Sequence, residues 1–494
     1  MELKVKFLKW SAGVPVVILN KKIAEEMGVH PRGRILISTL SEHPKELVAV
    51  VDTIENHIVN EKEIALSFEI KKIMKLKAGQ VVKISLFKPP KSLDLIKRKL
   101  DNKTLSEKQI EQIISDVVNN SLSDPEIALF VSAMYKQGMN MNETISLIKA
   151  ILKTGNKLSF DKKYVVDKHS IGGVPGNRTT PIIVPICASA GLIFPKTSSR
   201  AITSAAGTAD VIETIASVDF PISKINKIIK KTNACMVWGG ALDLVPADSK
   251  ILGVEKSLQI DPEAQLLASI ISKKLSVGSK YILIDIPYGK NSKITKKHAL
   301  RLKEKFEKLG KYFHKNLKVV LTRGSEPIGN GIGPVLEMID VIKVLSLKED
   351  SPKDLEEKSL FLAGEILEMV GKAEKGKGTE SARKILYSGK AFEKFKQIIK
   401  AQGGKLSRIK KAKFKKDIFL KKDNSIKEIN NLKISALAQI AGAPTDKAAG
   451  LYLYYHIGEK AKRGDKLLTI YAESKSRMRD ALRFYNTSKP IRMK

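Results

Sequence analysis

From Lys163 onward the chain alternates strand-like and helix-like segments, and this alternation constrains its fold most strongly. YVVDKHS reads as a strand, and after a glycine-rich loop the apolar run from Pro181 to Phe194 predicts a buried helix. The strand YILIDIPYG, a charged helix from Lys296 to Leu309 and the strand LKVVLTRG follow. Because helices between strands cover both faces of a sheet, the sequence predicts a large α/β domain with a mostly parallel sheet.

The rest of the 494 residues has other patterns, so we expect several domains. β-branched and aromatic segments near the N-terminus predict short strands, with small helices at KKIAEEMG and near EKEIALS. Helical spacing and capping residues follow a Pro-Pro linker, and the C-terminal part returns to strands, with turns at Gly458 and Gly464. The predicted multidomain α/β protein has an N-terminal β-rich domain (1–88), a helical domain (92–160, with 247–277 packing onto it), the α/β domain (163–246 and 278–403) and a C-terminal β-rich subdomain (405–494).

Cysteine and histidine usage argues against disulfide and metal frameworks. The two cysteines, Cys187 and Cys235, both lie in apolar stretches, and the seven histidines have no ligand-like spacing. The longest apolar run is too short to span a membrane, and the first residues read as a strand rather than a signal peptide. We therefore expect a cytoplasmic protein without a metal and without a membrane partner.

The formal net charge of +36 attracts anions. It has two explanations: a lysine-rich composition, which we favour, or a polyanion-binding surface. The lysines are spread along the chain, and aromatic residues are not interleaved with them as a base-stacking surface requires. A nucleic-acid partner is therefore not expected.

Two segments have the composition of anion-binding loops. DKHSIGGVPGNRTT lies between a strand and a helix, where glycines expose backbone N–H groups and Lys168 and Ser170 add a charge and a hydroxyl. It lacks the Gly-Lys-Ser/Thr ending of a Walker A loop, and a tight connection is an equal alternative. His169 is a base or a packed histidine. KTSSRAITSAAGTAD gathers several hydroxyls, Arg200 and Gly207, which suits a phosphate, whereas the simpler interpretation is a polar surface loop.

Two further segments carry polar groups in suggestive places. In IDPEAQLLASIISKK, Asp261 before Pro262 is a natural helix N-cap, and Ser269 and Lys273 share a helix face. DIPYGKNSK ends a strand and places Lys293 in the following loop, where ligands of parallel sheets bind. Each signal is weak alone.

Taken together, five ordered motifs resemble the thymidine phosphorylase superfamily, and within it the archaeal AMP phosphorylase branch with its added N-terminal domain. These motifs are DKHSIGGVPGN, TSSRAITSAAGTAD, CMVWGGALDLVPAD, IDPEAQLLASIISKK and DIPYGK. The resemblance implies phosphorolysis of AMP, with CMP and UMP as further candidates, to a free base and ribose 1,5-bisphosphate. It also implies a cleft that closes on substrates, inorganic phosphate as co-substrate, no cofactor, and a homodimer or larger assembly.

The resemblance also assigns roles to residues. Asp261 matches the proton donor to the leaving base, which needs a general acid. Lys168, Ser170 and Ser198 match phosphate-binding positions, and Thr208 matches both a phosphate and a nucleotide contact. The positions that match AMP contacts are Gly173, Ser199, Arg200, Ala201, Ile202, Thr203, Ser204, Thr208, Ser269 and Lys293.

One departure bears on the substrate. The thymidine enzymes carry an Arg before the helix of Ser269 that reads the pyrimidine, whereas GVEKSLQI here contains none. Ser269 and Lys273 match the other two base-reading positions, so a thymidine or pyrimidine nucleoside phosphorylase stays an alternative at this point.

Overall fold

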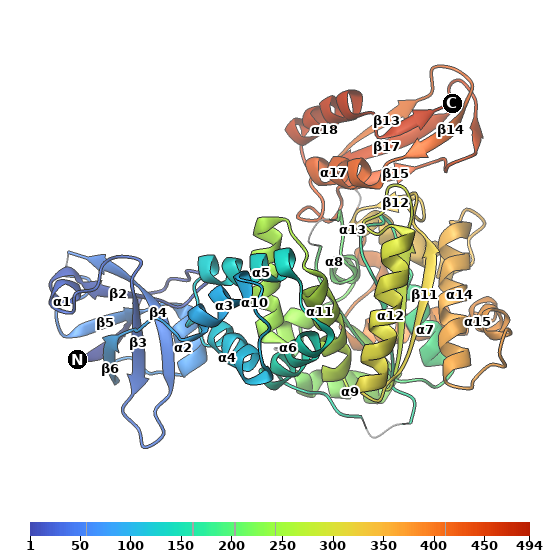
Figure 1. The fold of residues 1–494 in the computed structure, drawn as a ribbon. Coiled ribbons are helices and arrows are strands. Elements are labelled where there is room, and N and C mark those ends of the chain that lie inside the picture. The colour runs from blue at the N-terminus through green and yellow to red at the C-terminus, as the bar shows by residue number, and fades with distance from the viewer. Residues whose placement is uncertain (56, 161–162, 202–203, 243, 411) are drawn as a thin grey trace. The chain divides into compact units, whose positions relative to one another are not determined.

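The computed structural model describes residues 1–494 except 56, 161–162, 202–203, 243 and 411. The chain forms two units, one of Met1–Thr154 with Pro246–Ala268 and one of Gly155–Val245 with Ser269–Lys494. Figure 1 shows the course of the chain from the N-terminus (blue) to the C-terminus (red).

The first unit begins with a closed six-stranded barrel. Alternate residues such as Leu3 and Val5 are buried inside it, as the two-residue period of a strand requires. The small helix expected near EKEIALS is α2, which begins at Phe68 directly after this segment. EKEIALS itself, for which no strand was predicted, contains a strand that pairs with two neighbours. The strands in barrel order are β1 (Glu2–Phe7), β5 (Glu63–Leu66), β2 (Val16–Asn20), β4 (Glu46–Ile54), β3 (Arg34–Thr39) and β6 (Val81–Leu86), with α1 at Lys21–Glu26 and α2 at Phe68–Met74.

Helices make up the rest of the first unit. Capping boxes begin three of them, for example where Ser106 and Gln109 satisfy each other's backbone N–H groups. A buried ion pair joins Lys99 Nζ to Glu143 Oε1 at 2.9 Å. The helices are α3 (Ser92–Leu100), α4 (Glu107–Val118), α5 (Asp124–Gln137), α6 (Met141–Lys153) and α10 (Pro246–Leu258), the last of which packs on α4, α5 and α6.

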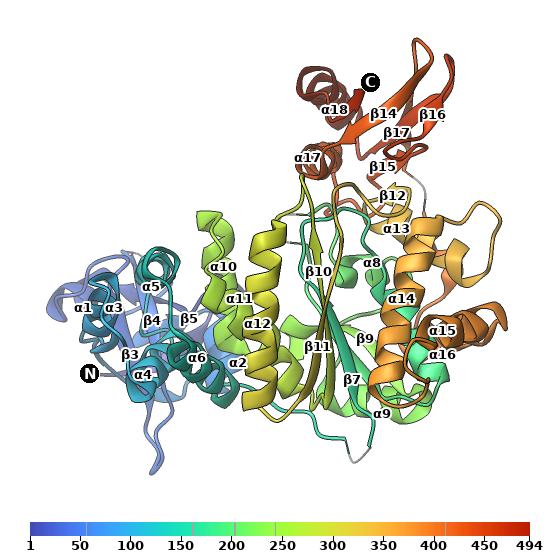
Figure 2. The same ribbon diagram turned by 45° about the vertical axis from the view of Figure 1, so that its right-hand side comes forward.

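The second unit is built on parallel strands, as the sequence predicts. Strands β11 (Asn316–Arg323), β10 (Tyr281–Tyr288) and β7 (Val166–Ser170) form one parallel sheet. Strands β8 (Phe194–Ser198) and β9 (Ala234–Trp238) form a second, and a bridge between Val165 and Ile193 joins the two. Helices α12 (Lys296–Tyr312) and α14 (Lys353–Met369) lie on opposite sides of the first sheet (Figure 2).

The buried helix predicted between Pro181 and Phe194 is also present. Helix α7 (Thr180–Ser189) is buried from Thr180 to Ala188, and the end of the apolar run begins strand β8 instead. The other helices of this part are α8 (Thr208–Glu213), α9 (Ile222–Thr232), α13 (Pro334–Leu345), α15 (Gly378–Tyr387) and α16 (Lys390–Ala401).

The C-terminal part of the second unit is β-rich. One sheet has the order β12 (Gly331–Ile332), β15 (Gly450–Leu453), β17 (Lys466–Ala472) and β13 (Phe414–Phe419), so a short strand from the middle of the chain completes it. The second sheet has the order β16 (Lys460–Ala461), β14 (Asn424–Ile429) and β18 (Ile491–Met493). Helices α17 (Asn431–Ala441) and α18 (Lys475–Ser488) pack on each other and on strands of the first of these two sheets. Gly458 and Gly464, where turns are predicted, have φ angles of 95° and 89°.

The predicted multidomain α/β fold class is thus confirmed, with a β-rich start, helices, a parallel α/β part and a β-rich end. In the parts of the chain that the structure describes, no helix is long and apolar enough to cross a membrane.

Candidate active site

Three polar loops follow strands β7, β8 and β10 in the second unit. Strands β7 and β10 are parallel neighbours, so the loops after Ser170 and after Tyr288 leave the sheet at the same edge. Gly173 in the first loop has a φ angle of 106°, and a Cβ atom there would lie 2.8 Å from the Cβ of Lys293 in the second. The structure therefore brings these two predicted AMP-binding residues together.

Lys168 is fully enclosed near the end of β7. Its side chain is 1% exposed, and its Nζ donates to the hydroxyl of Thr179 at 2.7 Å. Burial lowers the pKa of Lys168 to about 7, an effect that Lys358 and Lys196 reinforce and Asp285 opposes. An anion beside this ammonium group would stabilise its charged form.

Ser170 is engaged with the neighbouring strand. Its Oγ donates to Asp285 Oδ2 at 2.7 Å, and Thr322 donates to Asp285 Oδ1 at 2.6 Å. Lys358 forms an ion pair with the same carboxylate at 3.3 Å. Burial acts to raise the pKa of Asp285, but Lys358 and Lys168 outweigh it and lower this pKa. The hydroxyl proton of Ser170 is therefore directed to Asp285 in this structure.

Arg178 connects the glycine-rich loop to the hydroxyl-rich loop. Its Nε donates to Glu337 Oε2 at 2.6 Å, and its two terminal nitrogens donate to the hydroxyl of Thr208 and to the carbonyl of Ala206, both at 2.9 Å. Because arginine has no acceptor, the Thr208 hydroxyl accepts this bond and keeps its own proton for another partner. Arg178 thus orients Thr208 as a donor to a ligand.

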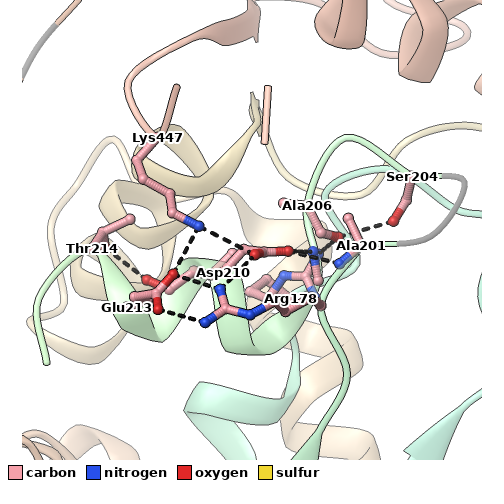
Figure 3. Close-up of polar contacts among 11 residues, drawn as sticks. Arg178, Ala201, Ser204, Ala206, Asp210, Glu213, Thr214 and Lys447 are labelled. Carbon is pink, nitrogen blue, oxygen red and sulfur yellow. Dashed lines mark hydrogen bonds and ion pairs between the residues drawn. The ribbon is translucent and has the colours of Figure 1, made fainter. Parts of the chain in front are cut away.

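The carboxylate of Asp210 joins two parts of the hydroxyl-rich loop between Ser199 and Thr208 by accepting hydrogen bonds from both. Asp210 Oδ2 accepts from the backbone N–H groups of Ala201 at 2.7 Å and Gly207 at 2.9 Å. Gly207 leaves no room for a side chain, because a Cβ atom there would lie 2.5 Å from the Ser199 carbonyl oxygen. Figure 3 shows Asp210 next to Ala201.

Arg200, which lies in this loop, contacts side chains of helix α8 and strand β9. Its guanidinium bonds both carboxylate oxygens of Glu213, at 2.6 and 2.7 Å, and lies 3.3 Å from Asp210. It also stacks over the ring of Trp238, 4.9 Å from the ring centroid. The hydrogen bond from Arg200 lowers the pKa of Glu213 to about 2.

Two buried hydroxyls at the end of β8 point to a ligand. Among the described residues, the Oγ1 of Thr197 and the Oγ of Ser198 are buried and have no hydrogen-bond partner. Buried polar atoms without a partner are rare in folded proteins. Ser198, a predicted phosphate-binding residue, therefore has a free donor, and Ser204 in the same segment donates to the Ala206 carbonyl at 3.0 Å.

The remaining predicted residues lie on or near helix α11 (Glu263–Ser276). Lys273 Nζ donates to Ser269 Oγ at 2.9 Å, so these two share a face as predicted. The helix begins at Glu263 with Leu266 N bonded to Pro262 O, so Asp261 stands one residue before the N-cap position. Asp261 belongs to the first unit, and Ser269 with the loops belongs to the second. Ile202 and Thr203 lie outside the described residues.

The buried basic side chains around Lys168 outnumber the carboxylates that pair with them directly. Asp167 pairs with Lys274 at 2.8 Å and with Lys196 at 3.4 Å, Asp285 pairs with Lys358, and Glu337 pairs with Arg178. Among these described side chains, five cations face three carboxylates. An uncompensated buried charge is unfavourable, so the set favours a bound anion. No group of three or more His, Cys, Asp or Glu in the described residues is placed to hold a metal ion.

Arg178, Thr179 and Asp285 were missed as site residues from the sequence alone. Arg178 and Thr179 lie inside the glycine-rich motif, which was the available signal. Asp285 lies in the middle of the strand YILIDIPYG, where a charged residue among apolar ones is unusual for a buried parallel strand. Their roles depend on partners as far as 159 residues away.

The fold of a solved structure supports this architecture. Anthranilate phosphoribosyltransferase from Thermus thermophilus aligns with 63% of this chain and 99% of its own, with a TM-score of 0.53 and 17% identity. At this identity the likeness concerns the fold alone.

Three family descriptions match successive parts of the chain. Residues 93–155 match the helical bundle domain of a glycosyl transferase family, and residues 162–279 match the a/b domain of a glycosyl transferase family. Residues 425–492 match the pyrimidine nucleoside phosphorylase C-terminal domain. Together these matches define an enzyme of the pentosyl-transferring class.

Relatives over the whole length identify the family. AMP phosphorylase of Pyrococcus horikoshii is 45% identical over 498 residues, covering 100% of this chain and 98% of the relative. AMP phosphorylase of Methanococcus vannielii is 40% identical over 493 residues, covering 99% of this chain and 97% of the relative. The chain belongs to the AMP phosphorylase family, which confirms the resemblance stated above.

Proposed function

We propose that this protein uses inorganic phosphate to cleave the N-glycosidic bond of AMP, releasing adenine and ribose 1,5-bisphosphate. The observation that carries the proposal is the excess of buried cations around Lys168, next to loops rich in hydroxyl and backbone donors. Two anions take part in such a reaction, the free phosphate and the 5′-phosphate of AMP. CMP and UMP remain further candidate substrates.

The chemistry divides between holding anions and assisting the leaving base. A phosphate oxygen forms the new bond to C1′ while the bond from C1′ to the base nitrogen breaks. Lys168, Ser198 and Thr208 are proposed to hold the attacking phosphate, because each can offer a proton to an anion. The Lys168 side chain and the Ser198 hydroxyl oxygen are buried, and Thr208 is half-buried. Ser170 joins them only if its bond to Asp285 is exchanged for one to phosphate.

Asp261 is proposed to donate the proton that the leaving base takes up. A base that leaves as an anion is a poor leaving group, so protonation in the transition state lowers the barrier. This role comes from the match of IDPEAQLLASIISKK to the family. Gly173, Ser199, Arg200, Ala201, Ile202, Thr203, Ser204, Thr208, Ser269 and Lys293 are proposed as the AMP contacts on the same ground.

The thymidine or pyrimidine nucleoside reaction is not favoured. The relatives that span this whole chain carry the AMP phosphorylase name, and GVEKSLQI lacks the Arg by which the thymidine enzymes read a pyrimidine. We further propose that the enzyme works in the cytoplasm as a homodimer or larger assembly, without a metal or organic cofactor.

The test is phosphate-dependent release of free base. Purified protein is incubated with AMP, CMP, UMP, adenosine and thymidine, each with and without inorganic phosphate. Adenine released from AMP only when phosphate is present supports the proposal. Thymine released from thymidine with AMP untouched would contradict it.

Asp261→Asn tests the assigned acid. The amide keeps the size of the side chain and loses the transferable proton, so kcat should fall about 100-fold or more. Asp124→Asn is the matched control, because Asp124 is an exposed residue at the start of α5 in the same unit. Equal activity of the two variants would remove Asp261 from the mechanism.

A further inference from the structure

Lys447 reaches from the C-terminal part of the second unit to the hydroxyl-rich loop. It lies in the connection between α17 and β15, more than 230 residues after the loop. Its ammonium group lies 3.2 Å from Asp210 Oδ1 and 2.9 Å from Glu213 Oε2 (Figure 3). All of these residues belong to the same unit.

The backbone of Lys447 is fixed, so its side chain starts from a defined place. Its carbonyl oxygen accepts from the N–H of Val335 at 3.0 Å, and the next residue, Ala448, donates to Asp446 Oδ1 at 2.9 Å. Gly450 follows with a φ angle of 151°, and a Cβ atom there would clash with the Ile332 carbonyl oxygen. The segment is therefore packed tightly against β12 and α13.

The two carboxylates that Lys447 contacts are the ones that shape the loop. Asp210, which is 2% exposed, holds the N–H groups of Ala201 and Gly207 with its other oxygen. Glu213 holds the guanidinium of Arg200 with both oxygens. In the described part of the chain, the ion pairs of Lys447 are with Asp210 and Glu213, so Lys447 acts on the loop through these two carboxylates.

Charge explains why Lys447 matters at this place. Asp210 and Glu213 carry two negative charges, and Arg200 and Lys447 carry two positive charges that balance them. Without Lys447 the cluster has a net negative charge directly beside a loop proposed to bind anions. Such a charge would weaken binding of both AMP and phosphate and free Asp210 to draw Arg200 away from Glu213.

A second contact from the same part of the chain supports this role. The side-chain amide of Gln439, in α17, donates to the carbonyl oxygen of Ser204 at 3.2 Å. Ser204 lies within the same loop as Ala201 and Gly207. The C-terminal part therefore contacts the loop directly, at the Ser204 carbonyl, and indirectly, through the Asp210 and Glu213 carboxylates of α8.

We propose that Lys447 is a positioning residue of the substrate loop, which makes the C-terminal part of the chain a component of the AMP site. This inference rests on the proposed function, since the loop's ligand is AMP. Lys447 holds the Asp210–Glu213–Arg200 arrangement in the form that accepts an anion. The chemical step itself does not use Lys447.

Steady-state kinetics separates positioning from catalysis. Lys447→Met should raise KM for AMP about tenfold and leave kcat within about twofold. Lys447→Arg keeps the charge and should recover most of the affinity. Lys466→Met is the matched control, because Lys466 forms an ion pair of 3.0 Å with Asp417 in the same C-terminal part and should leave KM unchanged.

A readout without turnover follows from Arg200 stacking on Trp238. The chain has two tryptophans, so in a Trp10→Phe background the emission comes from Trp238 alone. Lys447→Met should change this emission, and Lys447→Arg and Lys466→Met should not. Circular dichroism and thermal unfolding of each variant establish that the fold is intact.

The outcomes distinguish the two proposals. If the parent enzyme releases no adenine from AMP, the proposed function fails whatever Lys447 does. If it does so and Lys447→Met has unchanged KM and unchanged Trp238 emission, the inference about Lys447 is wrong. A variant that loses kcat with KM intact would overturn the positioning role as well, because it would assign Lys447 to the chemical step.

Discussion

The ammonium nitrogen of Lys168 lies 2.7 Å from the hydroxyl oxygen of Thr179, inside a region where burial lowers the pKa of this lysine to about 7. A hydroxyl is a neutral partner, so it satisfies the geometry of the ammonium group without balancing its charge. A bound anion next to Lys168 would therefore stabilise the charged form of this lysine and raise its pKa.

Sulfate inhibition should weaken as the pH rises through about 7. The lysine is charged below its pKa and neutral above it, and sulfate itself does not titrate between pH 6 and 9. The inhibition constant for sulfate should therefore rise above pH 7, by up to about tenfold per pH unit. Inhibition of AMP phosphorolysis, measured across this range, checks the trend.

Lys168→Arg provides the control for this titration. Arginine stays charged throughout the range, so the step in the inhibition constant should disappear. A step that persists in Lys168→Arg would assign it to another group, such as Lys274, whose pKa burial also lowers to about 7.

Removing Arg178 should cost both stability and activity. Its partner Glu337 is 1% exposed, and a buried carboxylate left without its ion-pair partner costs about 3–5 kcal/mol. We expect Arg178→Met to lower the free energy of unfolding by about this amount, measured by urea denaturation. The double variant with Glu337→Gln should recover part of the stability, but the activity should stay low because Thr208 loses its orientation.

Gly173→Ala should separate the two loops that meet at Lys293. The φ angle of 106° strains any other residue, and the new Cβ would lie 2.8 Å from the Lys293 Cβ. We expect kcat/KM for AMP to fall about tenfold or more, since displacements of about 1 Å in a site can cost that much. Gly172→Ala is the matched control, because no atom lies within 4 Å of a Cβ there. Similar kinetics for both variants would refute the role of this close approach.

Gln402→Ala should lower the stability of the second unit, although Gln402 makes its hydrogen bonds outside the proposed AMP-binding loops. Its amide accepts from Met236 N at 2.8 Å and donates to the carbonyls of Met236 and Ser217, both at 2.9 Å. Leaving such buried groups unpaired costs about 1–3 kcal/mol each. The midpoint of thermal unfolding should fall clearly for Gln402→Ala and little for Gln397→Ala, an exposed glutamine of α16 just upstream of Gln402.

Much of the fold follows from local pattern. The strand at Tyr281–Tyr288 and the helix that begins at Lys296 were predicted correctly, because apolar runs and helical spacing are local signals. The small helix near EKEIALS was predicted as well, whereas the strand within EKEIALS was not, since that strand depends on pairing with β1 and β2. Pairing between distant segments overrides a weak local preference.

The site was predictable only in part. Glycines and hydroxyls in two motifs indicated anion-binding loops, and the structure brings Gly173 and Lys293 together. The orientation of Thr208 by Arg178 was not predictable, because it requires the distant Glu337 to hold the guanidinium. Nothing in the sequence predicted the ion pair between Lys447 and Asp210, because the two residues are 237 positions apart.

The pairing of β12 with β15 has a consequence for the evolution and engineering of this chain. Gly331 and Ile332 form the edge strand of a sheet whose other strands lie beyond residue 413. A recombination event that exchanges only the C-terminal part would pair β15 with a β12 segment from another parent. Where the two do not fit, the edge of β15 is exposed, and exposed edges invite aggregation. Functional chimeras should therefore carry the segment around β12 and the C-terminal strands from the same parent.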